Sequence, residues 1–157
     1  LVSVLKGKDA MDIIAYTKQG NGLRFDTGTF TETNRMSRGV IGIDLVPNDE
    51  VVGIARITNS DDQMLILTDK GNGKRCTLDT FAKSDRRGQV LKLISLGKGE
   101  HLAFVIGCND FCEFRVLLKT DIFDVSADEF PELTRNHPGK KVIPVRKGDT
   151  IIKVVRK

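Results

Sequence analysis

The chain has 157 residues, of which 39% are hydrophobic, and it carries 25 basic and 21 acidic side chains. This length is enough to bury the core of one domain or of a short array of repeats. No run of about 18 apolar residues occurs, so we expect no membrane helix and no membrane partner. The first residues, LVSVL, read as a strand without its partner and not as a signal peptide, so we expect a fragment of a longer protein.

The first predicted repeat covers residues 12–57 and begins with the sequence IIAYTKQGNGLRF. Its Asn21-Gly22 pair lies between two apolar runs, which is typical of a β-hairpin with a tight turn. A phosphate-binding loop is disfavoured, because a Walker-type loop would carry Gly-Lys-Ser or Gly-Lys-Thr and open a helix. Phe30 and Arg35 follow, and the later apolar run VIGIDLV predicts a further strand.

The second predicted repeat, residues 63–108, reproduces the first at an offset of 51 residues. Its sequence MLILTDKGNGKRC predicts another hairpin, at Asn72-Gly73. A phenylalanine and an arginine again follow five residues apart, as Phe81 and Arg86. Self-similarity at a fixed period of this size is typical of propeller-like or solenoid arrays.

The third predicted repeat, residues 111–157, matches the others only in outline. Phe130 and Arg135 keep the five-residue spacing, but the hairpin glycines are absent, and Asp124 stands where the first two repeats have an arginine. Three repeats of four short strands predict an all-β array of about twelve strands in three four-stranded blades. Residues 126–135 are expected to form one helical turn in a loop at most.

Apolar strand positions are expected to form the core. We predict burial at Ile14, Tyr16, Ile41, Ile43, Leu65, Leu67, Leu91 and Leu93.

No motif for catalysis or metal binding is present. The cysteines, Cys76, Cys108 and Cys112, are expected to be reduced and buried. A structural zinc site needs four ligands, and the only histidines, His101 and His137, lie far along the chain from the C-x3-C pair. We therefore expect a non-catalytic chain without a metal or other cofactor.

Basic residues are concentrated in the second and third repeats. Residues 12–57 hold five basic and six acidic side chains, residues 63–108 hold eight and four, and residues 111–157 hold ten and seven. Such an excess is commonly just a solvated surface. Here, however, arginines recur at equivalent positions, which in a radial array fall on one rim and form a curved basic stripe suited to a bent polyanion. The candidate residues for binding this polyanion are Arg24, Arg35, Arg38, Lys70, Lys74, Arg75, Arg86, Arg87, Arg135, Lys140 and Lys141.

The repeated pattern resembles the blades of the carboxy-terminal domain of the type IIA topoisomerase A subunit, as found in bacterial DNA gyrase and topoisomerase IV. The pattern is an apolar strand, T-x-x-G-x-G-x-R, then Phe and Arg five residues apart, glycine and a second strand. The resemblance covers about residues 12–155 and is strongest in the first two repeats.

This resemblance implies a β-pinwheel, in which neighbouring four-stranded blades exchange a strand and three blades form a partial disc. It also implies that the candidate residues above are DNA-binding residues, on a basic rim that binds and bends duplex DNA. It also implies partners, namely the B subunit, together with the remainder of the A subunit, and a cytoplasmic, nucleoid-associated location. The nucleophilic tyrosine, the ATP site and the Mg²⁺ site of such an enzyme would lie outside this chain.

One departure and one alternative stay open. Gyrase-type domains carry the box Q-R-R-G-G-K-G, whereas the nearest sequence here is DRRGQV at residues 85–90. Either the box lies elsewhere in the parent protein, or the parent is similar to topoisomerase IV. The alternative function is a propeller-like protein-interaction platform that binds no DNA, which would suit the slightly acidic first repeat.

Overall fold

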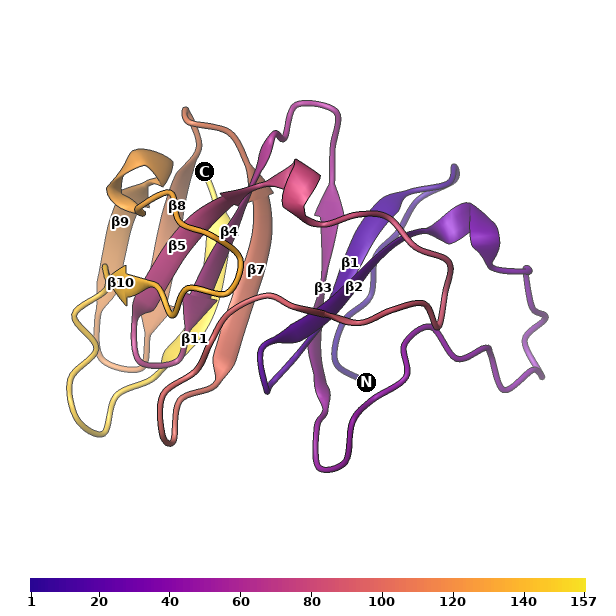
Figure 1. The fold of residues 1–157 in the computed structure, drawn as a ribbon, viewed down its shortest axis with the longest axis horizontal. Helices are drawn as coiled ribbons and strands as arrows, with labels where there is room; N and C mark the ends of the chain where they lie inside the picture. The colour runs from indigo at the N-terminus through magenta and orange to yellow at the C-terminus, as the bar shows by residue number, and fades with distance from the viewer.

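The computed structural model describes residues 1–157 as an all-β chain of eleven strands and three 3₁₀ helices (Figure 1). No α-helix is present, and so no helix is long and apolar enough to cross a membrane. The strands are β1 (Asp12–Thr17), β2 (Asn21–Asp26), β3 (Val51–Ile57), β4 (Gln63–Thr68), β5 (Asn72–Thr77), β6 (Leu91–Lys92), β7 (Leu102–Cys108), β8 (Glu113–Leu118), β9 (Ile122–Ser126), β10 (Lys140–Lys141) and β11 (Ile151–Arg156). The 3₁₀ helices are η1 (Thr27–Thr29), η2 (Leu78–Thr80) and η3 (Ala127–Glu129).

The strands form three antiparallel sheets that exchange a strand between neighbours. The orders are β3-β1-β2-β6, β10-β5-β4-β7 and β11-β8-β9. Each four-stranded sheet thus takes its fourth strand from the next repeat, which Figure 1 shows as the chain crossing from β5 towards β2 and back. The expected all-β blade array with strand exchange is confirmed. The third sheet has three strands instead of the expected four, because nothing pairs with the outer edge of β9.

The hairpins lie where the repeats predict them, but their turns begin earlier than expected. Positive φ occurs at Gly20 and Gly71, with φ of 84° and 83°, whereas Asn21 and Asn72 already begin strands. Each turn is braced by the threonine that ends the first strand; for example, the hydroxyl of Thr68 accepts from the Asn72 N–H at 3.2 Å. The prediction of an Asn-Gly turn is therefore wrong by one to two residues.

The second glycine of each G-N-G sequence permits close packing between blades. A Cβ on Gly73 would lie 2.6 Å from ring carbons of Phe130, and one on Gly22 would lie 2.7 Å from a methyl group of Leu93. Both Phe130 and Leu93 come from the following repeat. The glycines are thus explained by contact with the exchanged segment, not by turn geometry.

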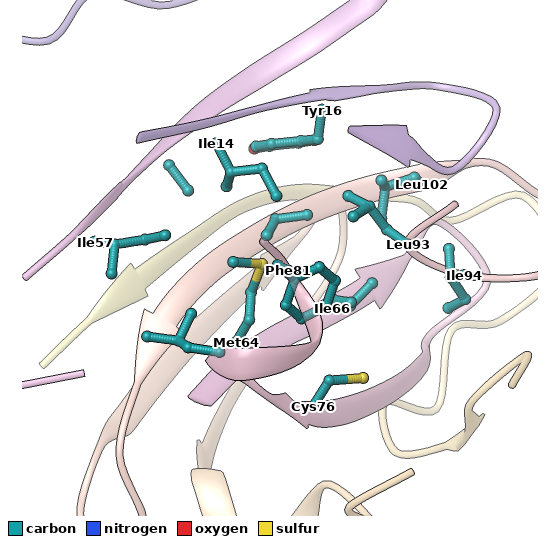
Figure 2. Close-up of a cluster of buried hydrophobic side chains, with 13 residues drawn as sticks. Ile14, Tyr16, Ile57, Met64, Ile66, Cys76, Phe81, Leu93, Ile94 and Leu102 are labelled. Carbon is teal, nitrogen blue, oxygen red and sulfur yellow. The ribbon is translucent and has the colours of Figure 1, made fainter. Parts of the chain in front are cut away.

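Two main cores lie between successive sheets. Ile14 of β1 packs with Met64 and Ile66 of β4 in the first core, which Figure 2 shows. Leu65 and Leu67, on the other face of β4, belong to the second core, against the third sheet. Both faces of β4 are therefore covered, which explains why its sequence is continuously apolar and does not alternate.

The segment around Ile41 departs from the predicted core. Ile14, Tyr16, Leu65, Leu67 and Leu93 are buried as expected, Ile43 and Leu91 are half-buried, and Ile41 is 56% exposed. The corresponding segments of the second and third repeats, which contain β6 and β10, pair with the preceding sheet, but the segment around Ile41 pairs with none. The expected strand at LVSVL is also absent from the structure.

Candidate nucleic-acid interface

Three equivalent β-turns each present an arginine at their second residue. We call them the arginine turns: Asn34–Ser37, Asp85–Gly88 and Thr134–His137. In each, the N–H of the fourth residue donates to the carbonyl of the first, at 3.0, 2.9 and 3.0 Å respectively. Arg35 and Arg86 are exposed and Arg135 is half-buried. The sequence period therefore places these three cations in the same local structure on successive blades.

The second and third arginine turns lie against the preceding repeat. Nη1 of Arg86 donates to the carbonyl of Ile41 at 3.3 Å, and Nη1 of Arg135 donates to the carbonyl of Lys92 at 3.4 Å. Ile41 and Lys92 occupy equivalent positions in their repeats. A guanidinium has five N–H donors, so one long contact leaves most of its hydrogen-bonding capacity free. These arginines therefore lie over the junctions between repeats with donors to spare.

Further predicted cations are exposed beside these turns. Arg38 follows the first turn, and Arg87 forms an exposed ion pair with Asp44 at 3.0 Å, which holds it only weakly. Lys140 and Lys141 form β10, two residues after the third turn. The ammonium of Lys141 donates to the carbonyl of Lys70, so these lysines gather at the end of the second sheet.

One exposed cation of the same kind was missed by sequence reasoning. Lys92 pairs with Asn21 in the first sheet, as Lys141 pairs with Asn72 in the second, so the two lysines are equivalent. The spacing of 49 residues between them was the available signal. Lys92 therefore joins the candidate interface.

Arg24 and Arg75, predicted as DNA contacts, are held inside the protein. Arg24 forms a two-point ion pair with Asp12 and donates to the carbonyl of Phe81 in the next repeat at 3.0 Å. Arg75, only 9% exposed, makes the equivalent bond to the carbonyl of Phe130 at 2.8 Å. These arginines clamp each repeat to the next, because a guanidinium can satisfy several carbonyls at once. Their repetition thus has a structural explanation, which argues against direct phosphate contact.

Lys74 also departs from the predicted exposed rim. It is completely buried, and its ammonium donates to the carbonyls of Thr134, Arg135 and His137 at 2.9, 2.5 and 2.8 Å. Burial lowers the pKa of Lys74 to about 8, and the neighbouring Arg135 acts in the same direction. Its charge lies behind the third arginine turn and not on the surface.

Asp124 occupies the register position of the two clamp arginines in the third sheet. It faces Arg115 across the β8–β9 pair, with Nε–Oδ1 and Nη2–Oδ2 distances of 2.7 and 2.8 Å, and Lys157 lies 3.2 Å away. These two cations hold the pKa of the Asp124 carboxyl well below its usual range. The third repeat therefore presents a neutralised ion-pair cluster at this position in place of a clamp.

The hairpins beside these cations are braced by acidic residues at equivalent positions. Glu100 accepts hydrogen bonds from the Thr68 hydroxyl and the Asn72 amide, both at 2.6 Å. Partial burial alone would raise its pKa, but the hydrogen bonds from Thr68, Gly97 and Asn72, together with Lys141, lower it. Asp49 and Asp149 brace the first and third hairpins in the same way.

The reactive side chains lie in surroundings that disfavour nucleophilic chemistry. All three cysteines are buried free thiols, as the sequence predicts. Burial and the neighbouring Cys112 raise the pKa of Cys108 to about 12, and burial raises the pKa of Cys76 and Tyr16. A nucleophilic cysteine requires the opposite shift, towards the thiolate.

The exposed cations are suited to phosphates and not to bases. No α-helix is available to enter a major groove, and Phe111 is the only strongly exposed aromatic side chain. Arginine and lysine on turns and strand ends match phosphate oxygens, whereas base readout needs an element inside a groove. The architecture is therefore that of a propeller-like blade array with exposed cations on equivalent turns and short strands.

Comparison with known sequences assigns this architecture to a family. The model of the family described as "DNA gyrase C-terminal domain, beta-propeller" matches residues 12–58, 62–109 and 125–156. The chain belongs to this family. The unmatched residues 110–124 cover much of the β8–β9 hairpin, where the third repeat has lost its glycines.

Individual relatives are DNA gyrase A subunits. The chain is 31% identical over 147 residues to the DNA gyrase A subunit of Haloquadratum walsbyi, covering 91% of this chain and 17% of that protein. It is 30% identical over 134 residues to the DNA gyrase A subunit of Staphylococcus aureus, covering 80% of this chain and 15% of that protein. The chain thus spans less than a fifth of the length of these relatives.

Solved structures show the same fold. A DNA gyrase A C-terminal domain superposes with a TM-score of 0.85 at 21% identity, covering 93% of this chain and 50% of that one. A C-terminal domain of DNA topoisomerase IV gives a TM-score of 0.83 at 19% identity, covering 93% and 46%. At these identities the likeness concerns the fold alone.

Proposed function

We propose that the chain binds duplex DNA independently of sequence and bends it across the edge formed by the arginine turns. It would serve as part of the carboxy-terminal domain of a bacterial type IIA topoisomerase A subunit. The observation that carries this proposal is the placement of Arg35, Arg86 and Arg135 at the same position of three equivalent exposed turns. Regularly spaced cations on a curved array suit the phosphates of a bent duplex.

The proposed role is to guide DNA and not to react with it. ATP, Mg²⁺ and the tyrosine that cleaves DNA would belong to the B subunit or to the remainder of the A subunit, and the site of action would be chromosomal DNA in the cytoplasm. Bending a site of about 20–30 base pairs costs on the order of 1–6 kcal/mol. Three blades therefore bind more weakly and bend less completely than a longer array.

Fluorescence anisotropy with a random-sequence duplex of about 25 base pairs, between roughly 25 and 200 mM salt, tests this function. Replacing Arg35, Arg86 or Arg135 by Ala should weaken binding to every duplex and flatten the plot of log affinity against log salt by about one unit each. Arg56→Ala is the matched control, because this exposed arginine lies on β3, at the opposite edge of the sheet from β6. Salt-independent binding, or a loss confined to one preferred sequence, would refute the proposal.

A protein-interaction platform is the second candidate. It is favoured by the exposed apolar side chains of the first repeat, which are Met36, Val40, Ile41, Leu45 and Val46. Single exposed apolar residues are ordinary, but a contiguous group often marks a binding surface. Binding of a protein partner that is insensitive to salt and is lost in Ile41→Asp, with no affinity for duplex DNA, would favour this function.

A further inference from the structure

A buried cation without a carboxylate partner supports the third arginine turn. The Lys74 ammonium has three N–H donors, and each meets a carbonyl of this turn, at 2.9, 2.5 and 2.8 Å. Burying a charge without a counter-ion is costly. The titratable groups that act on its charge are Cys76 and Arg135, and Glu132 acts in turn on Cys76. The backbone of His137 contacts the ammonium directly, and Lys74 forms no ion pair.

Every backbone carbonyl from residue 133 to residue 137 accepts a hydrogen bond from a side chain of the second repeat. Besides the three carbonyls bound to Lys74, the carbonyl of Leu133 accepts from the thiol of Cys76 at 3.1 Å. The carbonyl of Asn136 accepts from the hydroxyl of Ser95 at 2.7 Å. The second repeat thus fixes the orientation of the peptide planes along the turn.

Because the carbonyls point towards the second repeat, three consecutive N–H groups of the turn point away from it. In a trans peptide the N–H of one residue points opposite to the carbonyl of the residue before it, and the chain contains no cis peptide bond. The N–H groups of Thr134, Arg135 and Asn136 therefore point away from Lys74 and Cys76. None of the three donates to another protein group, and the side chains of Thr134 and Asn136 are exposed.

The second arginine turn lacks this arrangement. Leu23 stands at the position of Lys74 there, with only 1% exposure, so no cation lies beneath the turn. The N–H of Arg87, which corresponds to that of Asn136, donates to the carbonyl of Gly42 at 2.7 Å. Adjacent free amides backed by a buried cation are thus present at the third turn and absent from the second.

We propose that the outer face of the Thr134–His137 turn binds a phosphate oxygen through the N–H groups of Arg135 and Asn136 and the Arg135 guanidinium, and that Lys74 is its positioning residue. Successive N–H groups in a turn form an anion-binding concavity, and the buried ammonium adds attraction from behind. This inference rests on the proposed DNA-binding function. The ligand class is a phosphate monoester or diester, of which the DNA backbone is the intended source.

The first test compares Lys74→Leu, which copies the residue of the first repeat, with Arg135→Ala and Ser95→Ala. Duplex affinity by anisotropy should fall about threefold to tenfold in Lys74→Leu and in Arg135→Ala, with a smaller loss in Ser95→Ala. The combined Lys74→Leu, Arg135→Ala variant should lose less than the product of the two single effects, because both act on one phosphate contact. Near-native duplex affinity of folded Lys74→Leu alongside weakened Arg135→Ala would overturn the inference and leave the proposed function standing. Unchanged duplex affinity in Arg35→Ala, Arg86→Ala and Arg135→Ala would instead contradict the proposed DNA-binding function itself.

The pH dependence of duplex affinity distinguishes a positioning role of Lys74 in phosphate binding from a role in folding stability alone. Affinity of the wild-type chain should fall as the pH rises from about 7 to about 9, because an unprotonated Lys74 has lost one donor and its charge. Ser95→Ala should keep this dependence and Lys74→Leu should lose it. The same profile in Lys74→Leu as in the wild type would contradict the inference.

Amide NMR of the wild-type chain covers the case in which Lys74→Leu does not fold. Inorganic phosphate and, separately, a short duplex are titrated while the Arg135 and Asn136 amides are followed, with those of the second turn for comparison. Shifts at Arg135 and Asn136 with both ligands support the site. Shifts with inorganic phosphate but not with the duplex would mean that the turn binds free phosphate and not DNA. No shift with either ligand would mean that the turn is not an anion-binding site.

Discussion

Replacing Arg75 by Met distinguishes a clamp between blades from a DNA contact. The substitution keeps an unbranched apolar stem but removes the hydrogen bonds to the carbonyl of Phe130 at 2.8 Å, to the side chain of Gln63 at 2.8 Å and to Asp110. Hydrogen bonds to charged groups contribute about 1.5–3 kcal/mol each. The three do not add, because Asp110 is 62% exposed and regains water when the arginine is lost.

The expected loss of unfolding free energy for Arg75→Met is therefore about 3 kcal/mol, mostly from the buried acceptors of Phe130 and Gln63. For a chain of this length that corresponds to a fall in Tm of roughly 6–12 °C. Thermal and urea unfolding followed by circular dichroism measure it, with exposed Arg86→Met as the matched control, expected to change stability by less than about 0.5 kcal/mol. A normal Tm for Arg75→Met, with duplex affinity reduced as in Arg86→Met, would refute the clamp.

Three further outcomes are expected. Gly73→Ala should lower Tm, because its Cβ would lie 2.6 Å from the Phe130 ring; an unchanged Tm in differential scanning calorimetry would contradict the packing explanation. The pKa of Glu100 is lowered by folding, so its stabilising effect is present above the unfolded pKa of about 4.5 and is lost as the pH falls through the lower folded value. Urea unfolding between about pH 6 and pH 3 should therefore show a smaller decline in the free energy of unfolding for Glu100→Gln than for the wild type. Equal declines in the two proteins would argue against this role. Cys108, whose pKa is raised to about 12, should resist thiol reagents at about pH 8 until the chain is unfolded, and rapid labelling of the native chain at Cys108 would show that this thiol is accessible.

Much of the fold follows from local sequence, and much of the interface does not. The repeats, the all-β class and the short helical turn, observed at Ala127–Glu129, follow from periodicity and turn chemistry. The pairing of β6 with β2 joins residues far apart in the chain, so no local pattern indicates that Ile41, without such a pairing, is exposed. Non-local pairing likewise explains why residue 22 is a glycine. We interpreted Gly22 as a turn residue, but in the structure it leaves room for the side chain of Leu93.

The candidate site was predictable where the cation lies on a turn or on the short strand β10, and not where it lies on β2 or β5, which have a strand on both edges. Arg35 and Arg86 follow polar residues in turns, and the structure exposes them. Arg24 and Arg75 repeat just as regularly, yet the regularity reflects their equivalent bonds to carbonyls of the next blade. Periodicity reports that a position matters in every repeat, but burial decides whether it serves packing or binding.

The exchanged strands have a mechanical consequence. The Thr134–His137 turn leads through Pro138 and Gly139 into β10, whose pairing partner is β5 of the second repeat. In the proposed function, a stiff duplex bent across this turn would pull outward on it while straightening, and the pull would reach the second sheet through β10 and through the carbonyl bonds of Lys74. Tension on one blade would thereby be shared with its neighbour, so the array would resist the recoil of a bound duplex as a unit and not blade by blade.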